Sequence, residues 1–133
     1  MKFEGIYTPI ITPYDDKGSI NFDAIEAIIE DLIASGVHGL VIAGTTGEYY
    51  AQDVDERLEV MKVCKDIING RLPYIVGTGA IRTEDSVFYA EEAAKIGADG
   101  ILVATPPYAL PTERENALHA LAIDRAANLP IML

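Results

Sequence analysis

The clearest structural signal in this chain is Leu40-Val41-Ile42-Ala43-Gly44-Thr45-Thr46-Gly47-Glu48. Its first four residues are wholly apolar, which is typical of a strand buried on both faces of a parallel sheet. The glycines and threonines that follow are typical of a loop at the end of such a strand. Because parallel strands need long crossover connections, usually helices, this stretch predicts an α/β fold.

Short apolar runs and helical periodicities alternate along the rest of the chain. Upstream, an apolar run over residues 6–12 predicts a strand, and apolar residues at helical spacing over 22–33 predict a helix. Asn21 or Asp23 is placed to cap the start of that helix, and Gly36 is placed to end it. Downstream, the pattern predicts helices near 54–69, 84–96 and 113–127, and strands at 74–76, 101–104 and 130–133.

Two short sequences recur, which indicates a repeated unit. Residues 36–40 resemble residues 97–101 roughly sixty positions later, and residues 72–75 resemble 129–132 at a similar interval. Two strand–helix units occupy each interval, so eight would need about 240 residues, close to the ~250 of a parallel (β/α)8 TIM barrel. We therefore predict that the chain supplies the first four βα units plus strand five of such a barrel. Alternation alone leaves an open doubly wound sheet as the alternative.

The domain organisation follows from the same pattern. No linker-like or low-complexity segment interrupts residues 1–133, so we expect them to form the amino-terminal half of a single (β/α)8 barrel domain without an internal boundary. The last residues form a bare apolar strand, whose unpaired edge would invite association. We therefore expect the sequence to be a truncated part of a longer chain.

Composition and charge narrow the compartment and the partners. Hydrophobic residues make up 50% of the chain, but no apolar run is long enough to span a membrane. A formal net charge of −11 would repel nucleic acid and anionic membranes, so we expect neither as a partner. Cys64 is the only cysteine, which leaves no disulfide and no thiolate metal site and favours a reducing cytoplasm.

The loop after the buried strand is the first candidate site. Chemistry in parallel α/β folds gathers where strands end, and Gly44-Thr45-Thr46-Gly47 offers two hydroxyls and several N–H groups in a tight turn. Such a loop is a plausible cradle for a carboxylate. The alternative is that the threonine hydroxyls only satisfy hydrogen bonds of the turn.

Two further loops follow strands. Gly77-Thr78-Gly79 begins like a dinucleotide loop, but Arg82 stands where the third glycine should fall, so these glycines indicate close approach of a small ligand or a neighbouring strand. Thr105-Pro106-Pro107-Tyr108 holds a phenol at the mouth of the sheet, with a buried structural tyrosine as the alternative. Two histidines, His38 and His119, are expected to face solvent and are assigned no role.

The carboxylates cluster on the predicted helices, as in Glu26-Glu30-Asp31 and Glu91-Glu92. This placement is typical of solvated helix faces, so we predict no metal site.

Taken in order and spacing, residues 44–48, 77–79 and 105–108 resemble the dihydrodipicolinate synthase and N-acetylneuraminate lyase family. The similarity covers the whole chain, and Pro9 and Thr12-Pro13 also match the opening strand of the family. The resemblance implies a (β/α)8 barrel, usually a homotetramer built from tight dimers, without a cofactor. It implies a carbon–carbon or carbon–oxygen lyase or synthase that acts on pyruvate or a related short 2-keto acid through a lysine Schiff base.

Carried over by position, the resemblance assigns roles to the loop residues. Thr45 and Thr46, between Gly44 and Gly47, would bind the carboxylate of the keto acid, and Thr45 would also relay protons. Tyr108 would reach across the tight dimer interface into the relay of the neighbouring subunit. The second relay tyrosine would come immediately after Leu133, and the Schiff-base lysine would lie on the next strand.

The lysines of this chain fall on predicted helices, in the loop after the first strand or at the terminus, none at the end of a strand. We therefore expect the 133-residue chain to be inactive alone. The competing hypothesis is a non-catalytic half-barrel that binds small carboxylates or pairs with a second half.

Several positions depart from the pattern of the family. Ile81 replaces a usual asparagine, and Val54 and Arg57 replace histidines of the lysine-inhibited synthases, which argues against feedback by lysine. Tyr49-Tyr50 is bulkier than usual and Ala109 replaces a common asparagine. Both of these changes favour a sugar-acid dehydratase or aldolase branch.

Overall fold

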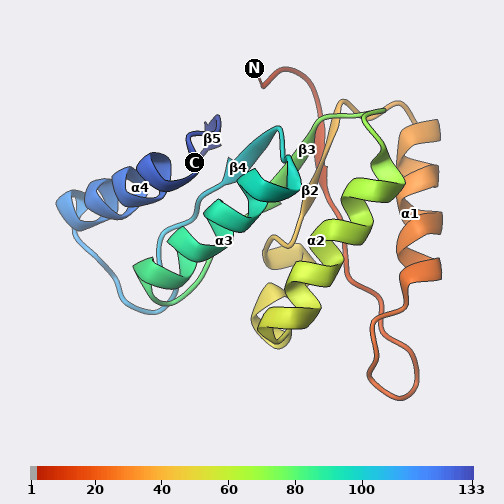
Figure 1. Ribbon diagram of the computed structural model, residues 1–133, viewed down its shortest axis with the longest axis horizontal. Coiled ribbons are helices and arrows are strands. Elements are labelled where there is room, and N and C mark those ends of the chain that lie inside the picture. Colours follow the sequence, from red (N-terminus) through yellow and green to blue (C-terminus); the bar gives the residue numbers. More distant parts are fainter. Residues whose placement is uncertain (1–2) are drawn as a thin grey trace.

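The computed structural model describes residues 3–133 and contains every predicted helix and strand (Figure 1). The α-helices and strands, in chain order, are β1 (Tyr7–Pro9), α1 (Phe22–Ala34), β2 (Gly39–Ile42), α2 (Val54–Ile68), β3 (Tyr74–Gly77), α3 (Thr83–Ile96), β4 (Gly100–Leu102), α4 (Glu113–Ala127) and β5 (Ile131–Met132). Two short 3₁₀ turns, η1 (Thr45–Gly47) and η2 (Tyr49–Ala51), lie between β2 and α2.

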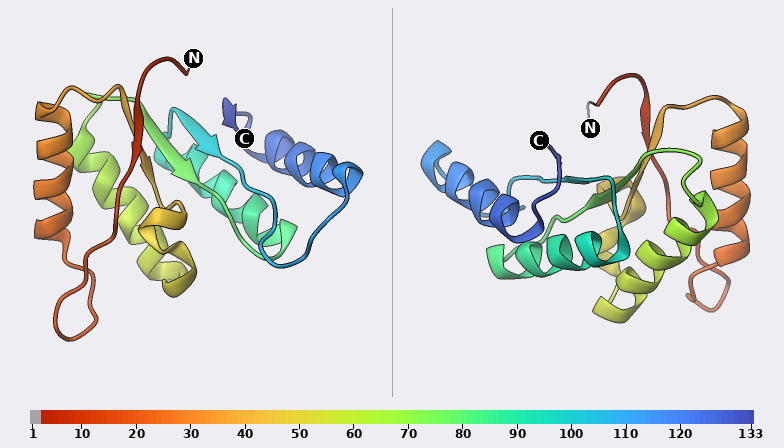
Figure 2. Two further views of the ribbon diagram at one scale, coloured as in Figure 1. Left: turned by 180° about the vertical axis from the view of Figure 1, so that it is seen from behind. Right: turned by 45° about the horizontal axis from the view of Figure 1, so that its top comes forward.

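The five strands form one parallel sheet in the order β1-β2-β3-β4-β5. Each strand thus pairs with its neighbour in sequence, whereas a doubly wound sheet reverses its strand order at a switch point. Helices α2 and α3 cover one face, and the view from behind shows the strands in front of them (Figure 2). This arrangement is the first part of a barrel wall, and the doubly wound alternative is wrong.

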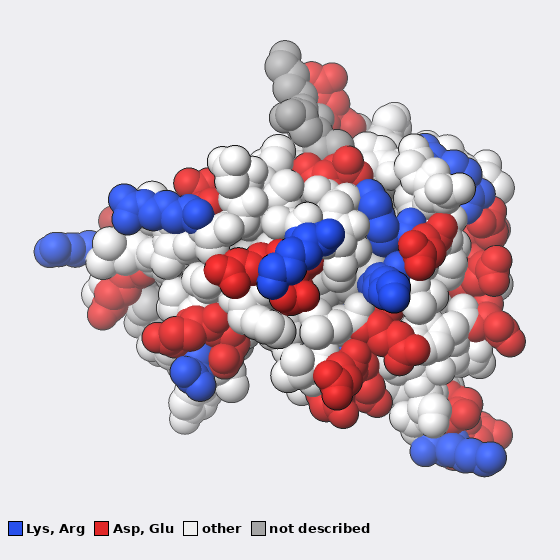
Figure 3. Space-filling view, in the orientation of Figure 1, with Lys and Arg blue, Asp and Glu red and all other residues white. Residues whose placement is uncertain are grey.

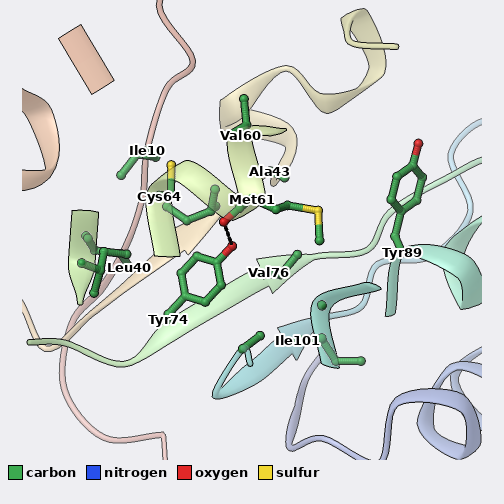
Figure 4. Close-up of a cluster of buried hydrophobic side chains, with 14 of the residues drawn as sticks. Ile10, Leu40, Ala43, Val60, Met61, Cys64, Tyr74, Val76, Tyr89 and Ile101 are labelled. Atoms are coloured by element: carbon green, nitrogen blue, oxygen red, sulfur yellow. Dashed lines mark hydrogen bonds between the residues drawn. The ribbon is translucent and has the colours of Figure 1, made fainter. Parts of the chain in front are cut away.

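The main core lies between the sheet and its helices (Figure 4). Leu40 and Ile42 of β2, and Tyr74 and Val76 of β3, point into it, because alternate strand residues face the same side. The Tyr74 hydroxyl donates a hydrogen bond of 2.6 Å to the Met61 carbonyl, which satisfies the buried phenol. The residues between them, such as Val41 and Ile75, are buried on the opposite face, which would be the barrel interior.

The two ends of α1 follow the predicted capping chemistry. Asn21 is the N-cap of α1, since its side-chain oxygen accepts a hydrogen bond from the Ala24 N–H at 3.0 Å. Gly36, just past the helix, has φ of +78°, a conformation that glycine adopts without strain. Helices α2 and α4 each begin with a capping box, Asp53 with Glu56 and Thr112 with Glu115.

The edge strands are shorter than expected. The predicted strand over 6–12 is regular only from Tyr7 to Pro9, although the Ile10 N–H still donates to the Val41 carbonyl at 3.1 Å. Beyond Ile10, the first strand has no neighbouring strand left to pair with. The neighbour, β2, ends here because Ala43 adopts φ of +55° and turns the chain into the next loop.

Acidic and basic side chains are spread over the face of the molecule that Figure 3 shows. Glu26, Glu30 and Asp31 are exposed, as predicted for solvated faces, and Glu30 pairs with Arg71 of the loop after α2. Within residues 3–133, no group of three or more histidine, cysteine or acidic side chains is placed to hold a metal ion. In the same residues, no helix has both the length and the apolar character that crossing a membrane requires.

Candidate functional site

The loops that the sequence singled out lie at one edge of the sheet. Residues 43–53, 78–82 and 103–112 each follow the carboxyl end of a strand, and these loops run along the lower side of the molecule in Figure 1. In barrels of this architecture, catalytic residues sit at this edge. The site is therefore built from the loops after β2, β3 and β4.

The Gly44–Glu48 loop is a single 3₁₀ turn closed by its own backbone. The Gly47 N–H donates to the Gly44 carbonyl and the Glu48 N–H to the Thr45 carbonyl, both at 3.0 Å. Thr45 and Thr46 are exposed, and within residues 3–133 neither hydroxyl takes part in a hydrogen bond. The turn therefore does not use the hydroxyls, and the alternative that they serve only the turn is wrong.

Gly47 is fixed by two side chains that hydrogen-bond to its backbone carbonyl. Its carbonyl accepts hydrogen bonds from the buried Thr12 hydroxyl at 2.8 Å and from the Gln52 side-chain amide at 3.1 Å. A Cβ at Gly47 would lie 3.2 Å from the Ile10 carbonyl oxygen, so a side chain would crowd the backbone. Gly47 thus shapes the cradle, while Thr45 and Thr46 present its free hydroxyls.

Arg57 of α2 is the main support of the loop after β3, and the sequence analysis missed this role. Its side chain is only 2% exposed, and its guanidinium donates to the Gly77 carbonyl at 2.8 Å and to the Gly79 carbonyl at 3.0 Å. The guanidinium carbon also lies 3.8 Å from the centre of the Tyr89 ring and 4.6 Å from that of Tyr49.

Burial lowers the pKa of Arg57, and the rings of Tyr89 and Tyr49 oppose that shift. The arginine remains a cation, because its pKa starts far above neutrality. Its position carried a usable signal: Val60, Met61 and Cys64 follow at helical spacing and are all buried, so Arg57 falls on the inward face of α2.

The glycines after β3 serve close packing between strands. A Cβ at Gly77 would lie 2.5 Å from the Ala43 carbonyl oxygen, closer than any real Cβ contact. Gly79 faces the Tyr49 ring, where a Cβ would approach to 3.1 Å. The neighbouring-strand interpretation of Gly77 is confirmed. The Tyr49 ring packs against the Arg57 guanidinium, so this contact accounts for the size of the side chain without a particular substrate.

Tyr108 stands fully in solvent. Its relative exposure is 101%, and its φ of +72° is uncommon for a residue with a side chain. The alternative of a buried structural tyrosine is wrong. Thr45 and Thr46 are neighbours in the cradle, but within residues 3–133 no hydrogen bond joins Tyr108 to either of them.

His119 differs from the expectation of a solvent-facing side chain. It is 6% exposed, and its Nδ1 lies 2.9 Å from the Thr83 hydroxyl. Burial lowers its pKa, while a hydrogen bond to the Ala104 backbone acts in the opposite direction. Helical spacing alone did not reveal this burial, because the packing partner, α3, comes from a distant part of the sequence. His38 is exposed, as predicted, and its Nδ1 accepts a hydrogen bond from the Ile6 N–H at 3.0 Å.

A hollow of about 340 Å³ lies beside Arg57, and neither Thr45 nor Thr46 lines it. Its lining includes most of the positions at which the sequence departs from the pattern of the family: Tyr49, Tyr50, Val54, Arg57 and Ile81. These five departures therefore share one place in the structure, whereas Ala109 does not line the hollow. Loss of feedback by lysine stays a prediction.

The lysines were expected to lie away from the strand ends. Within residues 3–133, Lys62 and Lys65 lie on α2, Lys95 lies on α3, and Lys17 lies in the loop after β1. Lys2 falls outside the described residues. No lysine of the described part thus sits at the carboxyl end of a strand, where the cradle is.

Known proteins resemble this chain in both sequence and structure. The 4-hydroxy-tetrahydrodipicolinate synthase 2 of Halalkalibacterium halodurans is 38% identical over 133 residues, which are 100% of this chain and 46% of that protein. The solved 4-hydroxy-tetrahydrodipicolinate synthase of Methylacidiphilum fumariolicum SolV superposes with a TM-score of 0.95 at 35% identity, over 99% of this chain and 44% of that one.

The dihydrodipicolinate synthase of Acinetobacter baumannii, solved in complex with pyruvate, gives a TM-score of 0.93 at 33% identity over 98% of this chain and 45% of that one. The chain thus spans about half the length of the relatives that it matches. Residues 2–133 match the sequence pattern of the Dihydrodipicolinate synthetase family. The chain therefore belongs to the Dihydrodipicolinate synthetase family.

Proposed function

We propose that the protein containing this chain is a Schiff-base synthase or lyase that acts on pyruvate or a related short 2-keto acid. The observation that carries the proposal is the threonine cradle at the end of β2, whose two hydroxyls are exposed and unused by the turn. The relative from Acinetobacter baumannii, which was solved with pyruvate, supports the same substrate class.

Each residue of the cradle has a separate task in this proposal. The Thr46 hydroxyl and the backbone N–H groups that begin η1 bind the carboxylate of the keto acid. The Thr45 hydroxyl binds the same carboxylate and passes protons during the addition or elimination step. Tyr108, whose side chain extends fully into solvent, completes the relay in a second copy of the chain, so the active protein is a homo-oligomer of tight dimers.

The remaining machinery lies outside residues 1–133 in the proposal. The nucleophilic lysine and the second relay tyrosine belong to the following strands, so the 133-residue chain is inactive alone. The reaction needs no cofactor, because the Schiff base itself withdraws electrons, and it takes place in the cytoplasm. The reading as a non-catalytic half-barrel remains the alternative for the isolated chain.

Reductive trapping tests the proposal. With pyruvate and borohydride, the full-length protein is expected to gain one covalent adduct, detected by intact mass, and the 133-residue chain to gain none. In the full-length protein, Thr45→Val is expected to lower kcat roughly 10²- to 10⁴-fold, because the proton relay is lost. Ser35→Ala removes an exposed hydroxyl at the opposite end of the sheet and serves as the control.

Two outcomes would contradict the proposal. The first is an adduct on the 133-residue chain, which would place the nucleophile among its own residues. The second is a Thr45→Val protein with unchanged kcat and KM, which would show that the loop is only a turn.

A further inference from the structure

Two side chains converge on the backbone carbonyl of Gly47, at the end of the threonine cradle. The buried Thr12 hydroxyl donates to this carbonyl at 2.8 Å, and the Gln52 side-chain nitrogen, Nε2, donates to it at 3.1 Å. Nε2 also lies 3.2 Å from the Thr12 hydroxyl oxygen, so the three groups form a closed triangle of hydrogen bonds. Thr12 follows β1 and Gln52 follows η2, so the triangle joins the loop after β1 to the loop after β2.

The peptide unit between Gly47 and Glu48 transmits this hold to Thr45. Its carbonyl is the one that Thr12 and Gln52 bind. Its N–H, which belongs to Glu48, donates to the Thr45 carbonyl at 3.0 Å. Because a peptide unit is planar and rigid, fixing the direction of its carbonyl also fixes the direction of its N–H. The backbone at Thr45 is therefore held through the Gly47 carbonyl.

The backbone on either side of the cradle is strained. Ala43, just before the cradle, and Glu48, at its end, have φ of +55° and +54°, in the left-handed region that residues with a side chain disfavour. Such a conformation persists where the surrounding contacts determine it. The peptide unit that Thr12 and Gln52 hold leads directly into Glu48, so their hydrogen bonds act at a strained end of the turn.

The need to satisfy buried groups does not explain both side chains. One donor satisfies a buried carbonyl, and the Thr12 hydroxyl already supplies it. The Gly47 carbonyl can only accept, so it orients the Gln52 amide with the nitrogen towards it and the oxygen away. Within residues 3–133, that amide oxygen is buried without a hydrogen-bond partner, a cost that a leucine would avoid. Stability alone therefore does not select glutamine at this position.

We propose that Thr12 and Gln52 are positioning residues for Thr45. By holding the Gly47 carbonyl, they fix the backbone from which Thr45 presents its hydroxyl to the substrate. The task of Thr45 rests on the proposed function, whereas the hold on the turn can be measured without it.

Three variants of the full-length protein test this role. Thr12→Val keeps the shape of the side chain and removes its hydroxyl, whereas Thr12→Ser keeps the hydroxyl and serves as the rescue. Gln52→Leu keeps a similar volume and removes the amide. The matched control is Asp99→Ala, which removes a carboxylate that accepts from the Tyr74 N–H at 2.9 Å, at the amino-terminal end of the strands. This control loses a side chain–backbone hydrogen bond far from the cradle.

Steady-state kinetics provide the first measurement. Thr12→Val is expected to lower kcat about 10- to 100-fold, and Gln52→Leu at least about fivefold, with little change in KM, because a misplaced relay hydroxyl affects the reaction more than binding. Thr12→Ser and Asp99→Ala are expected to stay within about threefold of the wild-type kcat.

Three kinetic results would overturn the proposal. The first is a wild-type kcat in Thr12→Val or in Gln52→Leu. The second is a loss in Thr12→Ser equal to that in Thr12→Val. The third is an equal loss in Asp99→Ala, which would show that any lost hydrogen bond of this kind lowers kcat. If Thr12→Val does not fold, Gln52→Leu decides the question, because Gln52 is only partly buried.

Amide hydrogen exchange provides the second measurement, independent of activity. The Gly47 and Glu48 amides donate to carbonyls of the same turn at 3.0 Å, so their exchange reports whether the turn is closed. Protection of a peptide covering residues 44–52 is expected to fall in Thr12→Val and Gln52→Leu and to be kept in the rescue and control variants. Unchanged protection in Thr12→Val and Gln52→Leu would overturn the hold on the turn. If the wild-type protein forms no adduct with any 2-keto acid, the proposed function fails, while the exchange experiment still decides whether the two side chains hold this turn.

Discussion

Arg57 offers the strongest test of how this site is built. Replacing it by methionine keeps an unbranched apolar stem of similar reach but removes the guanidinium that joins α2 to the loop after β3. The carbonyls of Gly77 and Gly79 then lose their donor, and the rings of Tyr49 and Tyr89 lose the cation between them. We expect Arg57→Met to destabilise the protein and to loosen this loop.

The magnitude follows from these contacts. Each buried carbonyl left without a donor costs about 1–3 kcal/mol, and loss of the desolvated cation–π contacts adds about 1–2 kcal/mol. Removing a buried cation relieves part of the desolvation cost of the folded state, which offsets some of this loss. We therefore expect the free energy of unfolding to fall by about 3 kcal/mol.

Urea denaturation followed by circular dichroism measures this change. The m-value is expected to stay constant, so that the shift of the midpoint reports stability alone. Arg82→Met is the control, because the Arg82 side chain is 67% exposed and its nearest ion-pair distances are 3.7 and 3.9 Å; it should unfold with the wild type. A loss below about 1 kcal/mol for Arg57→Met would refute the reasoning, as would full stability of Arg57→Lys, which cannot hold both carbonyls in one planar fork.

Two further predictions concern buried groups. Burial raises the pKa of the Cys64 thiol to about 12, whereas the unfolded chain ionises near pH ~8.5. Since the unfolded state then binds fewer protons, the free energy of unfolding should fall as the pH rises above about 8.5, by up to about 1.4 kcal/mol per pH unit. Urea midpoints measured between pH 8 and 10.5 should therefore fall less steeply with pH in Cys64→Ala than in the wild type. Parallel curves for the two proteins would contradict this. Gly77→Ala would place a methyl group 2.5 Å from the Ala43 carbonyl oxygen, whereas at Gly44 the nearest atom is 3.8 Å away. Thermal denaturation should therefore show a loss of about 2 kcal/mol or more for Gly77→Ala and little for Gly44→Ala; equal stability of the two would contradict the close approach of β2 and β3.

Local sequence patterns determined much of the architecture. The apolar run of β2 could be identified because both faces of a parallel strand are buried, and α1 because its apolar spacing, Asn21 cap and Gly36 end agree. The threonine cradle was located by the same logic, since a loop directly after a buried strand must lie at the edge of the sheet. These signals lie within a few residues of one another, so they can be read along the chain.

Contacts between distant segments decided the rest. Arg57 was noticed only as a departure from a family pattern, because its partners at Gly77 and Gly79 lie 20 and 22 residues further along the chain. His119 was expected in solvent, yet α3 and the end of β4 close over it. For Tyr108, burial stayed open as an alternative until the structure showed the side chain to be fully exposed.

The strand order is the most consequential feature that only the tertiary structure determined. Alternating strands and helices are compatible with both a closed and a doubly wound sheet, because the pattern of each unit is the same. The order of pairing depends on which edges meet when the units pack together. Local periodicity records how a segment is buried, whereas only the packed structure records which segments bury it.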